Sequence, residues 1–202
     1  MSTASVLTYD RVQLRPLRNR DWQELEHLLL SNRAWLKPWE ATNPEGPTSL
    51  DAKGMVKSLV RQTRDGSSIS FVILVDRQTS GLINVANIVF GSLSSAIIGY
   101  WVSESVAGRG VTPTAVALTC DYLFEQLHLH RVEIAIRPEN RASLRVVQKL
   151  GFRFEGLKER YIHINYAWRD HFIFALTKED VPQGVLARWK AGLAPETVIP
   201  ET

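Results

Sequence analysis

The feature that most constrains the fold is a run of strand, helix and strand patterns in the middle of the chain. Residues 96–102 and 131–136 are apolar and rich in β-formers, and a helical pattern over residues 115–126 separates them. Two strands joined through a helix require a crossover connection, which makes them parallel. Residues 69–75 and 82–90 lie just before and are separated only by short turns, which predicts antiparallel pairing. The chain is therefore expected to form a mixed sheet.

The rest of the pattern completes the order β-α-α-β-β-β-α-β-α-β-β. Further strands are expected at residues 12–16, 152–161 and 168–176, and further helices from Asp21 as a cap, at 49–64, at 142–150 and briefly at 185–190. We assign the chain to the α/β (α+β) class. The prediction is a mixed, mostly antiparallel central sheet of about seven strands with helices on both faces.

Composition places this sheet in an ordinary globular protein. The 202 residues are 45% hydrophobic and 22% charged, which fits one domain over residues 1–202, with a core at about 8–178 and a tail at 179–202. No apolar run is long enough to cross a membrane, and residues 1–5 do not resemble a secretory signal. The single cysteine, Cys120, rules out an internal disulfide, so we expect a cytoplasmic protein.

Net charge and histidine spacing argue against nucleic-acid binding and against a metal site. The net charge of +3 is too small to predict direct nucleic-acid binding. His128 and His130 are two residues apart, but no third ligand accompanies them, so no metal site is expected. We expect a monomer or a homodimer.

A glycine-bearing loop, Gly108-Arg109-Gly110, joins the strand at 96–102 to the next helix. Glycines let the backbone approach a ligand, and a helix N-terminus offers free N–H groups, so the segment suits a phosphate or pyrophosphate, with Arg109 adding a charge. A tight turn into a helix explains the same glycines equally well. The loop is not a P-loop, because no Gly-Lys-Ser/Thr follows it.

A second segment begins at Asn140, which reads as a helix N-cap. Leu144, Val147 and Leu150 then fall on one helix face, and Gly151 suits the C-terminal cap. Capping alone explains much of this segment.

The two segments together resemble the GNAT superfamily of N-acetyltransferases. The resemblance rests on the order and spacing of Tyr100-Trp101-Val102, Gly108-Arg109-Gly110, Asn140-Arg141-Ala142-Ser143, Lys149-Leu150-Gly151-Phe152 and Glu155-Gly156. It covers about residues 8–178. Within the superfamily, the blocks at 32–40 and 168–171 are most similar to the ribosomal-protein alanine N-acetyltransferases.

The resemblance implies an acetyl-CoA site in a V-shaped opening between the fourth and fifth strands, here residues 96–102 and 131–136. The pantetheine arm would run along Trp101 and Val102, and the pyrophosphate would rest on residues 107–112 and the start of the next helix. Asn140 matches a cofactor-contacting asparagine, and Ser143 matches a position near the thiol. The cofactor residues implied are Trp101, Val102, Ala107, Gly108, Arg109, Gly110, Val111, Thr112, Thr114, Asn140 and Ser143.

The chain departs from the family's phosphate-binding pattern, Gln/Arg-x-x-Gly-x-Gly/Ala, at two positions. Ala107 stands at the first position and Thr112 at the last, while Gly110 matches the central glycine. Pro113 also removes one N–H donor. The hydroxyls of Thr112 and Thr114 are expected to compensate.

The family's reaction is direct attack of an amine on the thioester. A protein α-amine has a pKa of about 7.7–8.0, against about 10.4 for lysine, so an N-terminal acceptor needs only a modest base. We assign catalysis to Glu104 as the base and Ser143 beside the thiol. Glu155, Glu159 and Glu40 are alternative bases. Each of these carboxylates is also explained as an ordinary surface group.

The acceptor side is assigned to Trp35, Trp39, Glu40 and Tyr100. The loop carrying the tryptophans is expected to line a peptide channel with Glu40 facing the substrate ammonium, although Trp35 and Trp39 also suit a purely structural role. The predicted function is acetyl-CoA-dependent acetylation of a protein N-terminus, in particular of a ribosomal protein with a small first residue such as alanine. The alternatives are an acetyltransferase for a small amine, such as an antibiotic or polyamine, and a weakly active acyl-CoA-binding module.

Overall fold

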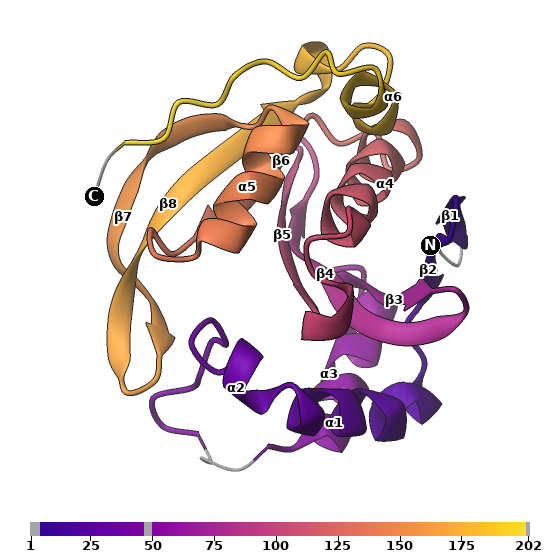
Figure 1. The fold of residues 1–202 in the computed structure, drawn as a ribbon, viewed down its shortest axis with the longest axis vertical. Helices are drawn as coiled ribbons and strands as arrows, with labels where there is room; N and C mark the ends of the chain where they lie inside the picture. The colour runs from indigo at the N-terminus through magenta and orange to yellow at the C-terminus, as the bar shows by residue number, and fades with distance from the viewer. Residues whose placement is uncertain (1–4, 47–49, 201–202) are drawn as a thin grey trace.

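The computed structural model describes residues 5–46 and 50–200. Its framework is one eight-stranded sheet in the order β1-β2-β3-β4-β5-β6-β8-β7 (Figure 1). The strands are β1 (Leu7–Tyr9), β2 (Val12–Pro16), β3 (Ile69–Val75), β4 (Gln78–Val89), β5 (Ser95–Val102), β6 (Arg131–Ile136), β7 (Arg153–Ile164) and β8 (Ala167–Thr177).

The pairing confirms the predicted fold class. β5 and β6 pair in parallel, and all other neighbouring strands pair antiparallel. The helix between β5 and β6 is α4 (Val111–Glu125), which makes the expected crossover. The sheet has eight strands rather than about seven, because Leu7–Tyr9 forms a hairpin with β2. Asp10 makes the tight turn possible with a φ of 51°, a conformation that Asp tolerates better than most residues.

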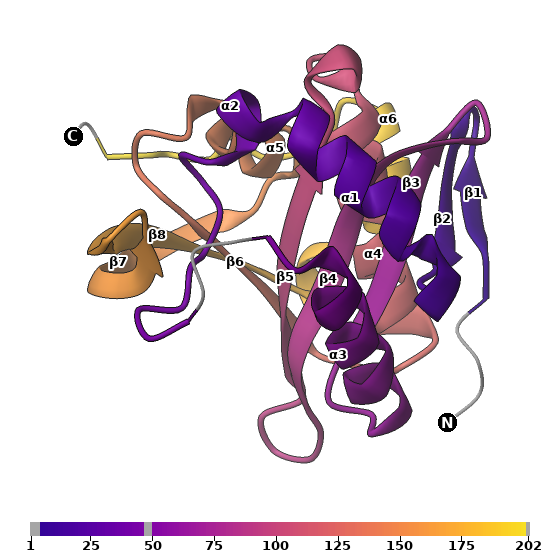
Figure 2. The ribbon, with the colours of Figure 1, turned by 90° about the horizontal axis from the view of Figure 1, so that it is seen from below.

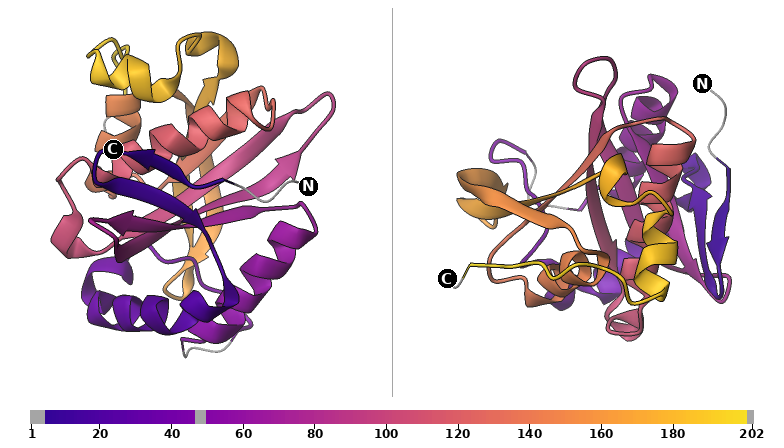
Figure 3. Two further views of the ribbon diagram at one scale, coloured as in Figure 1. Left: turned by 90° about the vertical axis from the view of Figure 1, so that its right-hand side faces the viewer. Right: turned by 90° about the horizontal axis from the view of Figure 1, so that it is seen from above.

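Helices cover both faces of the sheet, as predicted. α1 (Trp22–Ser31) and α3 (Ala52–Arg64) lie on one face, together with the short α2 (Arg33–Leu36) (Figures 1 and 2). α4, α5 (Arg141–Leu150) and α6 (Val185–Lys190) lie on the other (Figure 3). The larger core lies beneath α4 and α5, and a smaller apolar cluster lies beneath α1 and α3. No helix among the described residues is long and apolar enough to cross a membrane.

Several predicted element boundaries were wrong. α4 begins at Val111 rather than at residue 115, because Pro113 fits the first turn of a helix. The segment that was expected to be the loop carrying Trp35 and Trp39 contains the short helix α2. The third helix begins at Ala52, after Asp51 accepts a hydrogen bond from the Gly54 N–H at 2.8 Å; the expected start at residue 49 lies outside the described residues.

Asp21 is at the start of α1 but does not cap it with its side chain. The buried carboxylate instead accepts hydrogen bonds from the Arg18 N–H at 2.7 Å and from the Arg15 guanidinium at 2.9 and 3.1 Å. The prediction that Asp21 caps α1 was wrong, because its carboxylate bonds to Arg15 and Arg18 and not to amides of the helix. These bonds hold the end of β2 against the start of α1.

The sheet opens between β5 and β6. The two strands share only three register pairs, the last being Ile97 with Glu133. Beyond these pairs, β5 stays with β4 as far as Val102, and β6 stays with β8 as far as Ile136. Because each strand follows its outer neighbour, the centre of the sheet is left open at one end.

Candidate active site

Two cavities meet at this opening. The α5-side cavity, of about 370 Å³, is bordered by the end of β5, the glycine loop and the first turns of α5. The α3-side cavity, of about 450 Å³, is bordered by α1, α3, the ends of β6 and β7, and residues within β4, β5 and β8. Both are lined by Leu36, Trp39, Tyr100, Trp101, Asn140 and Ser143. Molecules entering from opposite faces of the sheet therefore come together at these six residues.

The glycine loop forms one wall of the α5-side cavity through its backbone. Gly108 and Gly110 have φ values of 73° and 80°, and a Cβ on Gly108 would meet only open space. The loop leads into the 15-residue helix α4, whose first amides have no partner within the helix. Turned amides at a helix N-terminus are a ready site for phosphate groups.

The side chains of two predicted cofactor residues near this loop face away from the cavity. Val111 is buried in the main core. The Thr114 hydroxyl is also buried and donates to the Gly110 carbonyl at 2.8 Å. These two residues can therefore contact a cofactor only through the backbone, whereas Ala107 and Thr112 line the cavity as expected.

Positive charge near this cavity comes from α5 rather than from Arg109. The exposed Arg109 side chain lines a separate hollow with Arg11 and Asp76. Three cations of α5 line the α5-side cavity instead, spaced at four-residue intervals: Arg141, Arg145 and Lys149. Residues four apart lie on one face of a helix. The sequence pattern therefore indicates this positive face, although the predicted cofactor residues did not include Arg145 or Lys149.

The end of β5 presents part of its backbone to the opening. The Ser103 N–H donates to the Ser80 carbonyl on β4 at 2.7 Å. Because successive residues of a strand point their N–H and C=O groups to alternate sides, the N–H and C=O of Val102 point away from β4. The Trp35 indole N–H donates to the Val102 carbonyl at 3.1 Å. Trp35 was assigned to the acceptor, but it lines only the α5-side cavity. Trp39 lines both cavities.

The residues shared by the cavities include an unusual hydroxyl. Asn140 caps α5 as predicted, with its side-chain oxygen accepting from the Ser143 N–H at 3.1 Å. The Tyr100 hydroxyl is buried and makes no hydrogen bond of good geometry with the described residues, although the Ser143 side chain lies near enough to interact with it. Burial raises the pKa of Tyr100, and the neighbouring Ser143 hydroxyl opposes that rise only in part. A buried polar atom without a protein partner is free to bond a ligand atom or a water molecule.

The α3-side cavity is lined by apolar side chains with a few polar groups. Glu40 lines it and forms an ion pair with Arg33. Arg137 lines it too, donates to the Pro38 carbonyl at 2.8 Å and lies over the Trp39 ring at 5.5 Å, which holds residues 37–40 against the end of β6. His171, on β8, completes the polar lining and was not predicted to belong to the site.

Of the four candidate bases, the structure brings only Glu40 to these cavities. Glu104 is exposed and lines neither cavity, and its N–H donates to the buried Asn32 side-chain oxygen at 2.9 Å. Glu155 also lies elsewhere; hydrogen bonding to Arg131 lowers its pKa. Glu159 is exposed and does not line either cavity.

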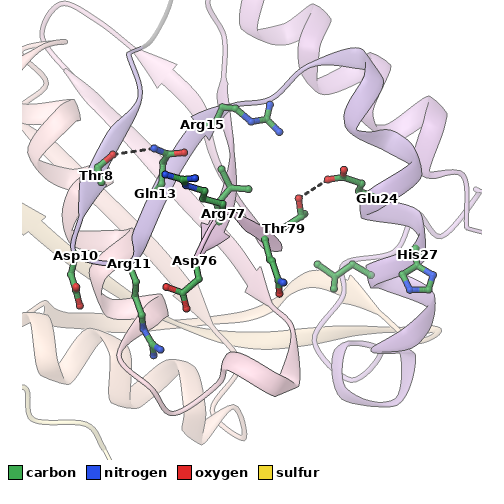
Figure 4. A pocket seen from close by; sticks show the side chains of 13 residues that line it. Thr8, Asp10, Arg11, Gln13, Arg15, Glu24, His27, Asp76, Arg77 and Thr79 are labelled. Carbon is green, nitrogen blue, oxygen red and sulfur yellow. Dashed lines mark hydrogen bonds between the residues drawn. The ribbon is translucent and has the colours of Figure 1, made fainter.

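A wider hollow, about 1050 Å³, lies apart from this site. It is an open, polar depression beside β1, β2 and α1, crossed by hydrogen bonds from Gln13 to Thr8 and from Thr79 to Glu24 (Figure 4). It shares no lining residue with the two cavities. Within residues 5–46 and 50–200, no three His, Cys, Asp or Glu side chains gather as a metal site.

The donor set of the α5-side cavity fits a phosphate-bearing cofactor with a polar acyl end. Backbone amides and α5 cations suit phosphates, and the Tyr100 hydroxyl lies free at the far end. The chain belongs to the GNAT acetyltransferase family, whose domain model matches residues 11–153.

Individual relatives agree with this assignment. The chain is 32% identical over 184 residues to the [ribosomal protein uS5]-alanine N-acetyltransferase of Escherichia coli, covering 88% of this chain and 93% of that one. A solved structure of Mycobacterium smegmatis RimJ in complex with CoA-disulfide superposes with a TM-score of 0.84 at 35% identity, covering 96% of each chain. The E. coli spermidine N(1)-acetyltransferase is 27% identical over 161 residues, covering 79% of this chain and 82% of that one. The protein is thus an acetyl-CoA-dependent N-acetyltransferase.

Proposed function

We propose that the protein acetylates the N-terminal α-amine of a protein, specifically of a ribosomal protein with a small first residue such as alanine. The observation that carries this proposal is the meeting of two cavities from opposite faces of the sheet at six shared residues. This arrangement lets a cofactor and a separate acceptor chain be bound at the same time. The similarity to the uS5-alanine enzyme of E. coli supports the choice of acceptor.

The residues of the chain divide the work between the two cavities. Acetyl-CoA, when bound, supplies an acetyl group activated as a thioester. The loop at Gly108 and Gly110 holds the phosphates through backbone amides. The Tyr100 and Ser143 hydroxyls are the donors at the meeting point that can hold a proton for the departing sulfur. Glu40 favours an ammonium entering the other cavity, although Arg33 offsets part of its charge.

An α-amine suits this site better than a lysine side chain. With a pKa of about 7.7–8.0, a sizeable share of an α-amine is already neutral near pH 7.5, whereas only about one lysine in a thousand is. The α3-side cavity is lined by one carboxylate, Glu40, and that group is ion-paired. A site with so little free negative charge therefore requires an amine that loses its proton readily.

A polyamine acceptor is the second candidate, favoured by the similarity to a spermidine acetyltransferase. A polyamine carries several positive charges and requires several carboxylates. The cavity offers Glu40 alone, with the Arg137 guanidinium also in its lining. This charge balance favours the peptide.

The test is a comparison of acceptors with acetyl-CoA. Peptides beginning with Ala or Ser, the same peptides with a blocked N-terminus and an internal lysine, and spermidine are each incubated with the protein, and free CoA and acetylated product are measured. We expect turnover on free N-termini beginning with small residues and none on the blocked peptides. Turnover on spermidine alone would replace the peptide proposal, and CoA binding without turnover on any acceptor would indicate a binding module.

A further inference from the structure

Four titratable side chains line the α3-side cavity: Glu40, Tyr100, Arg137 and His171. Three are poorly suited to accept a proton. Arg137 carries only donors. The Tyr100 hydroxyl retains its own proton, because burial raises its pKa. Glu40 is held in an ion pair with Arg33. The remaining group is His171.

The position of His171 follows from the strand register. Phe172 pairs with Ile136, the last residue of β6, so His171 lies one residue beyond that last register pair, at the open end of the gap between β5 and β6. The side chain is only 3% exposed. The Tyr161 ring packs edge-on against the imidazole at 6.0 Å between centroids, which fixes the plane of the ring.

Hydrogen bonding defines the tautomer of His171. Its Nδ1 lies 2.9 Å from the Arg169 carbonyl oxygen. A carbonyl only accepts, so Nδ1 must carry the proton, and Nε2 carries the free lone pair. No partner for Nε2 occurs in the part of the chain that the structure describes. A buried imidazole that lines a substrate cavity with a free lone pair is arranged as a base.

We propose that His171 Nε2 accepts the proton that the acceptor amine loses during acetyl transfer, a step that rests on the proposed function. The amine nitrogen bonds to the acetyl carbonyl carbon, and the bond from that carbon to sulfur breaks with its electron pair leaving on sulfur. The surplus proton on nitrogen passes to Nε2. The sulfur takes a proton from a donor at the meeting point, the imidazolium later returns its proton to solvent, and the donor regains a proton from solvent. His171 thereby takes the role that the sequence assigned to Glu104.

The surroundings of His171 keep the imidazole neutral at the pH where an α-amine reacts. Burial lowers the pKa of His171 below its ordinary value, and the charge of Arg137 acts in the same direction. The hydrogen bond to Arg169 and the charges of Glu139 and Asp170 act the opposite way. The titratable or charged groups around the ring are Lys158 and Tyr161 on β7, Arg169 and Asp170 on β8, and Arg137 and Glu139 after β6.

The experiment compares wild type with His171→Asn and His171→Gln on an N-terminal peptide from pH 5 to 9. General-base catalysis contributes typically about 100-fold or more, so we expect kcat to fall by at least about 100-fold with little change in KM. At pH values below the pKa of both groups, log(kcat/KM) of the wild type should fall with a slope of two, because both the amine and His171 must be unprotonated. In the variants the slope should be one. His27→Asn, an exposed histidine beside the separate hollow of Figure 4, is the matched control and should retain the wild-type rate and slope.

NMR of the labelled imidazole, assigned through the backbone, gives a readout that does not depend on activity. We expect the Nδ1–H tautomer at pH 7.5 and a titration midpoint below about 6.5, the ordinary pKa of histidine. The Nε2–H tautomer, or variants that keep the wild-type rate and slope, would overturn the role of His171 while the proposed function stands. If the wild type acetylates no N-terminal peptide, the proposed function fails and this step fails with it.

Discussion

The Tyr100 hydroxyl is the residue-scale feature that distinguishes this site most clearly from ordinary packing. It is buried without a partner in the part of the chain described, yet it lies where the two cavities meet. Leaving a buried donor unsatisfied costs about 1–3 kcal/mol. A ligand atom bound where the cavities meet would remove this cost.

Replacing Tyr100 with Phe should therefore separate stability from activity. We expect Tyr100→Phe to be at least as stable as the wild type, because an unsatisfied hydroxyl is removed. Its free energy of unfolding should be higher by up to about 3 kcal/mol, and its denaturant midpoint should be equal or higher. Its kcat should fall, because a donor near the sulfur is lost. Denaturant unfolding and steady-state rates measure the two effects. Tyr122→Phe is the matched control, since Tyr122 packs edge-on against Phe71 in the core. A less stable Tyr100→Phe protein with unchanged kcat would contradict this role.

Asn32 shows why the sequence could not indicate where Glu104 lies. Its buried side-chain oxygen accepts from the Ser103 hydroxyl at 3.0 Å and from the Glu104 N–H at 2.9 Å. These contacts join the end of α1 to the end of β5 across about seventy residues of sequence. No local pattern encodes a contact of that range, so Glu104, whose N–H is engaged there, was assigned to catalysis by its place in the chain alone.

At the scale of elements, helix α5 carries the positive face of the α5-side cavity. Arg141, Arg145 and Lys149 stand one turn apart and line the cavity, whereas Arg109 lies at a separate hollow. Exposed charge pairs contribute only about 0.2–1 kcal/mol each. We expect Arg145→Gln to raise the Kd for CoA about two- to fivefold, more at low salt than at high salt, because salt screens exposed charges.

Arg109→Gln is the matched variant for this prediction. It removes the same charge from a loop that the sequence placed on the pyrophosphate, and we expect a smaller effect on the Kd for CoA. Calorimetric titration of both variants at two salt concentrations measures the difference. An equal or larger loss of CoA affinity in Arg109→Gln would contradict this expectation and support the prediction that Arg109 contacts the pyrophosphate.

Local pattern predicted the elements well and the site only in part. Capping, turn residues and apolar periodicity are short-range signals, and they identified the crossover at α4, the cap at Asn140 and the parallel pairing of β5 with β6. The first strand was missed because Leu7–Tyr9 is only three residues long. His171 was not predicted because its place at the cavity depends on β6 ending beside β8, which is a property of the sheet and not of the sequence around the histidine.

At the scale of the whole molecule, the layered architecture separates the two substrates. Helices α4 and α5 cover one face of the sheet, and α1 and α3 cover the other (Figures 1 and 2). One cavity lies on each of these sides, and the two meet at the opening in the sheet. Separate entrances allow both substrates to be bound together. A covalent route would instead require a nucleophile on the protein at the meeting point.

The single cysteine does not provide that nucleophile. Cys120 is fully buried within α4 and lines neither cavity, and burial raises the pKa of its thiol well above the ordinary value. A thiol in that state is unreactive, because the thiolate is the nucleophile.

Acetyl transfer should therefore proceed through a complex of the protein with both substrates. Double-reciprocal plots at several fixed peptide concentrations should intersect rather than run parallel. Intact mass analysis after incubation with acetyl-CoA alone should show no acetylated protein, and Cys120→Ala should retain turnover, because Cys120 serves only the core. Parallel plots together with an acetyl-protein would mean that one substrate leaves before the other binds, and the two entrances would then not be used simultaneously.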